Sequence, residues 1–135
     1  MISQPARLYV LFAGVFLLLQ GTSTLAFRLY PPLDRAFPAL LELTRMIPTH
    51  SLLHIGTALI ALWIFFKGGP RAPFWFALLF GLFYLFLAVA GHITGHQLGL
   101  GLQPFDHPFH VALGSLGLFA VAIEIYLSRL RHAEP

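Results

Sequence analysis

Long apolar runs alternate with short polar connections along this chain, and the pattern predicts four membrane-spanning helices. Uncharged runs extend over residues 8–27, 51–66, 72–91 and 111–123. Each is close to the ~20 residues with which a helix crosses ~30 Å of hydrocarbon. We therefore predict a single all-α integral membrane domain, an antiparallel four-helix transmembrane bundle with spans at about 7–27, 49–66, 73–97 and 107–130.

The connection between the first two predicted spans is the longest, and it is amphipathic. Apolar and charged residues alternate between Leu33 and Arg45, which predicts a short helix lying in the membrane interface. Pro48 is suitably placed to open the second span at its first turn. The first apolar run is longer than the ~7–15 residues of a signal-peptide core, so we expect it to be retained as a span.

Composition supports the membrane assignment and excludes nucleic acid as a partner. The chain is 58% hydrophobic and 10% charged, whereas soluble domains are about half apolar and a quarter charged. The net charge of +3 comes from basic residues at span ends, where they set orientation. The lipid bilayer is thus the expected partner, and a homo-oligomer or a larger membrane complex remains open.

The distribution of basic residues predicts the orientation of the bundle. One side carries five (Arg7, Lys67, Arg71, Arg129 and Arg131) and the other carries three (Arg28, Arg35 and Arg45). Because cytoplasmic connections are enriched in Lys and Arg, both termini are expected in the cytoplasm, with the protein in the cell's inner (cytoplasmic) membrane.

Six of the seven histidines form three pairs, and the topology predicts that the pairs meet. Residues three or four apart share a helix face, and these pairs fall at the start of span 2, the end of span 3 and the start of span 4. Those three positions lie on the side opposite the termini. The predicted cluster comprises His50, His54, His92, His96, Asp106, His107 and His110, with Asp34 or Glu42 within possible reach.

Imidazole and carboxylate groups indicate a metal site. Cysteine is absent, so any ion must be held by nitrogen and oxygen. Neutral imidazoles bind Zn, Fe and Cu, and we predict one of these transition metals as the cofactor. No catalytic residue is assigned, although a metal-activated water with Asp106 or Glu42 as base is a possible chemistry.

Three alternatives to that metal site stay open. Haem b could be held between histidines on facing helices, although axial histidines are usually single on each helix. The histidine boxes of membrane desaturases and hydroxylases have similar spacings, but their His-His doublets are absent here. The protein could instead be a non-catalytic accessory subunit of a larger complex, with its histidines merely at the interface.

Two weaker patterns concern packing. The polar patch of residues 20–24 ends in hydroxyls that can bond back to the helix or across to a neighbour. The aromatic residues Trp63, Trp75, Tyr30, Tyr84 and Tyr126 are interpreted as mostly interfacial, because such residues gather at span ends.

Two segments, HSLLHIGTALIAL and FDHPFHVALGSLGL, resemble segments of a known family. It is a family of small four-span bacterial membrane proteins catalogued as a domain of unknown function, with His-x-x-x-His in span 2 and Asp-x-x-x-His at the start of span 4. The resemblance implies the four-span fold and a shared site at His50, His54, Asp106 and His110. It implies no activity, and His92, His96 and His107 lie outside the family pattern.

Overall fold

Four long helices make up most of the protein. The computed structural model describes residues 4–38, 47–94, 99–102 and 105–133, and contains no strand within them. The long helices are α1 (Pro5–Leu29), α4 (Pro48–Lys67), α5 (Ala72–Thr94) and α6 (Asp106–Ala133). All four are long and apolar enough to cross a membrane. The predicted all-α four-span architecture is confirmed.

The helix boundaries follow local sequence signals. α1 begins at Pro5 and α4 at Pro48, because proline lacks an N–H that a first helical turn leaves unpaired in any case. α4 ends where the N–H of Gly68 donates to the carbonyl oxygen of Ile64 at 2.9 Å. The third span was predicted to reach residue 97; α5 is helical to Thr94, and residues 95–98 lie outside the described residues.

The connection between α1 and α4 contains the short helix α2 (Pro31–Ala36). It begins with two prolines and ends where the N–H of Phe37 donates to the carbonyl oxygen of Leu33 at 3.0 Å. A short helix is therefore present at the start of the segment for which an interfacial helix was predicted, and its location in the interface stays a prediction. Residues 39–46, including Glu42, lie outside the described residues.

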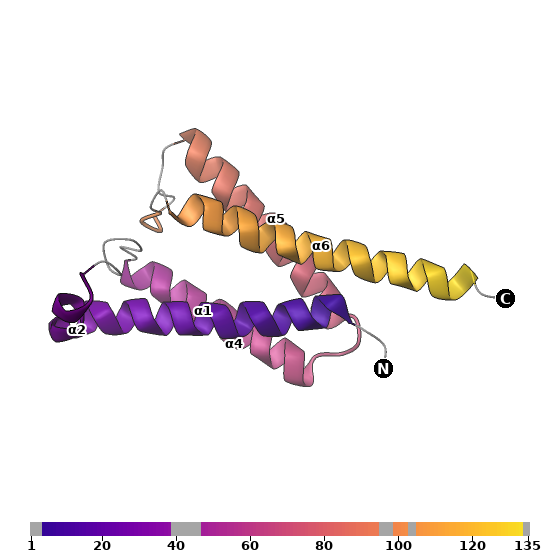
Figure 1. Cartoon of the computed structure of the whole chain (residues 1–135), viewed down its shortest axis with the longest axis horizontal. Coiled ribbons are helices and arrows are strands. Elements are labelled where there is room, and N and C mark those ends of the chain that lie inside the picture. The colour runs from indigo at the N-terminus through magenta and orange to yellow at the C-terminus, as the bar shows by residue number, and fades with distance from the viewer. Residues whose placement is uncertain (1–3, 39–46, 95–98, 103–104, 134–135) are drawn as a thin grey trace.

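The four long helices pair into two hairpins, as Figure 1 shows. α1 packs mainly on α4, and α5 packs mainly on α6. The hairpins meet chiefly through α1, which also contacts α5 and α6, whereas α4 and α5 touch little. The first turn of α1 and the last turn of α6 lie at one end of the bundle, at the right of Figure 1. The start of α4 and the start of α6 lie at the other end, as the predicted topology requires.

Glycines set the closest approaches inside each hairpin. A Cβ atom on Gly114 would lie 2.8 Å from the carbonyl oxygen of Gly81, so α5 and α6 cross almost backbone to backbone. A Cβ atom on Gly21 would lie 2.8 Å from the carbonyl oxygen of Ser51, where α1 crosses α4. Small residues allow such contacts between membrane helices, which associate through packing rather than through hydrophobic burial.

Most of the buried side chains in the bundle are apolar, and many large side chains on its outer surface are apolar as well. Residues such as Leu17, Ala58 and Leu113 are buried, while Trp63 and Phe86 are more than half exposed. The hydroxyl of Tyr9 donates to the carbonyl oxygen of Leu113 at 2.9 Å, which satisfies one buried polar group. Large apolar side chains on the outside are what a bilayer solvates, so these helices contact lipid.

Candidate metal site

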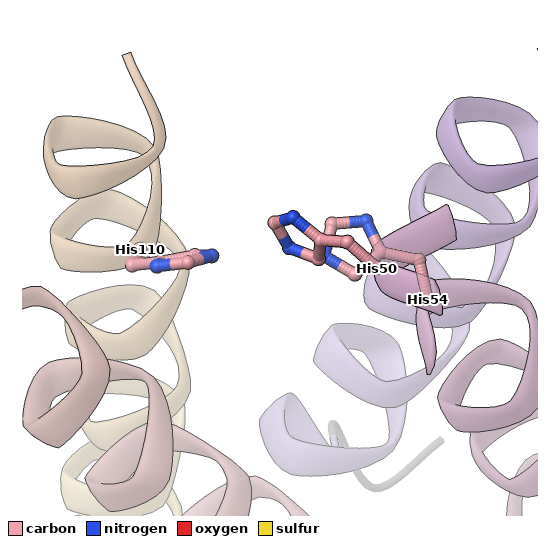
Figure 2. A group of neighbouring side chains, drawn as sticks. All are labelled: His50, His54 and His110. Carbon is pink, nitrogen blue, oxygen red and sulfur yellow. The ribbon is translucent and has the colours of Figure 1, made fainter. Parts of the chain in front are cut away.

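Three histidines from two hairpins meet in the interior of the bundle. His50 and His54 come from the first two turns of α4, and His110 comes from the second turn of α6. One ligand nitrogen from each lies within 4.8 Å of those of the other two. Figure 2 shows the ring of His110 facing the other two rings across the space between α4 and α6. We refer to His50, His54 and His110 as the three-histidine cluster.

The cluster combines one local contact with one long-range contact. His50 and His54 are four residues apart, so their rings stack along one face of α4, with centroids 4.6 Å apart and planes at 78°. His110 adds the contact between hairpins, with its ring centroid 6.1 Å from that of His50. Sequence spacing predicts the first contact, and the second depends on how the hairpins pack.

The cluster is buried, and four of its six nitrogen atoms have no hydrogen-bond partner among the described residues. His50 and His54 are 1% exposed, and His110 is fully buried. Within the described residues, Nδ1 of His50, Nδ1 of His54 and both nitrogens of His110 make no hydrogen bond. A buried polar group without a partner costs about 1–3 kcal/mol. Each neutral imidazole carries one nitrogen lone pair, and three imidazoles with nitrogens within 4.8 Å of one another form a donor set that a metal ion can use.

Helix α1 holds the histidine-bearing turns of α4 in place. The missing side chain of Gly21 lets α1 lie directly against the Ser51 carbonyl and the Cβ of His54. One turn further along α1, the hydroxyls of Thr24 and Ser51 form a buried hydrogen bond of 2.9 Å. Thr24 also donates back to the carbonyl oxygen of Gln20 at 2.9 Å. The predicted role of the polar patch, bonding back to the helix and across to a neighbour, is confirmed for Thr24.

Tyr84 belongs to the wall of the cluster, and its interpretation as an interfacial aromatic is wrong. It is 3% exposed, and its ring centroid lies 4.8 Å from that of His110 and 6.5 Å from that of His54. Tyr84 is near the middle of α5, far from either end of the span. One sequence signal could have found it: Tyr84 carries the only polar side-chain group between residues 76 and 90.

A buried carboxylate accompanies the histidines. Asp106 is the first residue of α6 and is 1% exposed. It precedes His110 by four residues, so the two side chains share a helix face. Asp106 is also close enough to His50 to interact with it electrostatically. Asp106 therefore lies near the cluster, but its carboxylate does not belong to the group of ligand atoms that are all within 4.8 Å of one another.

The other predicted site residues do not join the cluster. His92 is exposed and His107 is half buried, and their rings form a separate pair with centroids 6.1 Å apart. His96 and Glu42 lie outside the described residues, and only the backbone of Asp34 is described. Of the six paired histidines, the structure therefore brings three together and sets two apart.

Comparison of the chain with known protein families, with curated proteins and with solved structures finds no match. The resemblance to the four-span bacterial family therefore stays a prediction. The fold and the site by themselves define a four-span membrane protein with a buried cluster of histidines.

Proposed function

We propose that this protein binds one transition-metal ion, Zn²⁺ or an ion of Cu or Fe, inside the membrane through the three-histidine cluster. The main observation is the convergence of three buried imidazoles, in which Nδ1 of His50, Nδ1 of His54 and both nitrogens of His110 lack hydrogen-bond partners among the described residues. Three imidazoles leave a fourth coordination position for a carboxylate or a water. Asp106, buried four residues before His110, is the candidate carboxylate, and because its oxygens lie outside the group of ligand atoms within 4.8 Å of one another, it would have to move closer to bind the ion.

We also propose that the site faces the extracytoplasmic side of a bacterial inner membrane. The cluster lies at the end of the bundle opposite the termini, and the larger number of basic residues at the terminal end supports a cytoplasmic location for the termini. Past the cluster toward the termini, the interior is lined by Leu17, Ala58, Ala61 and Ala77. A path for ions would need polar groups there, so we infer a binding site open to one side rather than a conduit.

The geometry favours a bare ion over haem b. In a haem held by two histidines, the imidazoles bind the iron from opposite faces of the porphyrin. The third imidazole of the cluster has its ligand nitrogen within 4.8 Å of the other two. It would therefore occupy the space of the porphyrin ring. Three imidazoles are also fewer than the histidine boxes of two-iron membrane enzymes contain.

The test is metal content and affinity of the full chain purified in detergent without chelator. Elemental analysis is followed by competition for Zn²⁺ against a chromophoric chelator. We expect His110→Ala to weaken Zn²⁺ binding by more than ~100-fold, because loss of outer-sphere partners alone typically costs 10–100-fold. The matched control is His132→Ala, in the last turns of α6 at the other end of the bundle.

Two outcomes decide against the proposal. Negligible metal in the wild-type protein, together with no competition for added Zn²⁺, Cu²⁺ or Fe²⁺, would leave the accessory-subunit interpretation. Equal affinities in the His110→Ala and His132→Ala variants would show that the bound metal lies elsewhere. A Soret band in the absorption spectrum of the purified protein would replace the bare ion with haem.

A further inference from the structure

A second histidine pair lies outside the three-histidine cluster. His92, near the end of α5, and His107, the second residue of α6, have ring centroids 6.1 Å apart. This equals the separation of His50 and His110 within the cluster. Two imidazoles that share one ion each place a nitrogen about 2.0–2.1 Å from it, which such a separation of rings allows.

The sequence of α5 makes room for the ring of His107. A Cβ atom on Gly91 would lie 2.7 Å from Cε1 of His107 and 3.2 Å from its Nδ1. The ring therefore occupies the space that any other residue at position 91 would fill. Its Nδ1 atom is buried and has no hydrogen-bond partner among the described residues. His107 is thus held beside His92 with a nitrogen still lacking a partner.

Exposure decreases stepwise from this pair to the cluster. His92 is exposed, His107 is half buried and His110 is fully buried. His107 and His110 are three residues apart on α6, so their side chains are neighbours on the helix surface. The imidazoles therefore form a series of decreasing exposure from the surface of the protein to its buried cluster.

We propose that His92 and His107 form a second, weaker transition-metal site through which an ion passes on its way to the three-histidine cluster. This inference rests on the proposed function. Two imidazoles bind an ion less tightly than three, so the ion is favoured to move inward. The two imidazoles replace some of the water molecules bound to the ion before it enters the apolar interior. This partial replacement lowers the free-energy barrier to entry.

The experiment uses the full chain in lipid nanodiscs, with Zn²⁺ as the probe. Equilibrium titration counts the bound ions, and stopped-flow mixing with a fluorescent Zn²⁺ indicator measures the rate of entry. We expect the wild-type protein to bind one ion tightly and one weakly. His92→Ala should abolish the weak site and slow the filling of the tight site several-fold, while the affinity of the tight site stays unchanged.

A second variant tests the same geometry without removing a histidine. Gly91→Ala adds a methyl group where the ring of His107 lies, so it should also weaken the outer site and slow entry. His132→Ala is the control and should change neither quantity. Because His92 is exposed, its replacement does not disturb the packing of the helices.

Two results would overturn the inference and leave the proposed function standing. In the first, the wild-type protein binds one tight ion and the His92→Ala variant fills that site at the wild-type rate. In the second, His107→Ala weakens the tight site by more than ~100-fold, which would make His107 a ligand of the cluster itself. A wild-type protein that binds no ion at all contradicts both the inference and the proposed function.

Discussion

Replacing Gly21 with alanine should displace the α4 turns that carry two of the three clustered histidines. The new Cβ atom would lie 2.8 Å from the carbonyl oxygen of Ser51, whereas an ordinary van der Waals contact is at least 3.4 Å. The difference, 3.4 − 2.8, is about 0.6 Å. A backbone carbonyl cannot rotate out of the way, so α1 and α4 must separate by roughly this amount at the crossing.

The change in stability caused by Gly21→Ala follows from two opposing contributions. Overpacking of this kind costs about 1–3 kcal/mol. Alanine in place of glycine inside a helix stabilises the helix by about 1 kcal/mol. The net loss of stability is therefore roughly 0–2 kcal/mol. Zn²⁺ affinity should be affected more than stability, because the distances between a metal ion and its ligands are held within about 0.2 Å.

Gly56→Ala is the matched control for this substitution. Gly56 lies in the same helix, α4, and a Cβ atom there would have nothing within 4 Å. We expect Gly56→Ala to keep the wild-type Zn²⁺ affinity and to be at least as stable as wild type. Thermal unfolding is followed by circular dichroism in one detergent with chelator present, and Zn²⁺ affinity is measured separately by competition.

The outcome that refutes the reasoning is specific. If Gly21→Ala and Gly56→Ala have the same melting temperature and the same Zn²⁺ affinity, then the approach of α1 to α4 does not position His50 and His54. A loss of affinity in Gly21→Ala without a matching loss in Gly56→Ala supports the geometry described above.

Two further predictions concern protons and hydrogen bonds. Zn²⁺ affinity should fall as the pH is lowered far enough to protonate the clustered imidazoles, because only neutral imidazoles bind metal and protons compete for the same nitrogens. Competition titrations at several pH values check this, and an affinity that rises on acidification would contradict histidine ligation. In a double-mutant cycle of unfolding, Thr24→Val and Ser51→Ala should show a coupling energy of about 0.6 kcal/mol, which is the average for hydrogen bonds between membrane helices. Additive effects of the two substitutions would show that the 2.9 Å contact contributes no coupling.

The sequence by itself determines the four spans, their antiparallel order and the end of the bundle at which the histidines gather. Each of these properties depends on short-range information, because a run of apolar residues sets a span and short connections set the topology. The local pairing of His50 with His54 is determined in the same way, since helical periodicity alone places both rings on one face.

Only the tertiary structure decides which of the paired histidines meet. Contact between His110 and the α4 pair depends on how closely the hairpins approach, and Tyr9 of α1 sets that approach by packing against Gly117 of α6 and donating to the carbonyl oxygen of Leu113. The same packing brings Tyr84 to the wall of the cluster from the middle of α5. It also holds His107 beside His92, with its ring centroid 6.1 Å from that of His92. Helical periodicity fixes the face on which a side chain lies, whereas the partner opposite that face depends on small residues distant in the sequence.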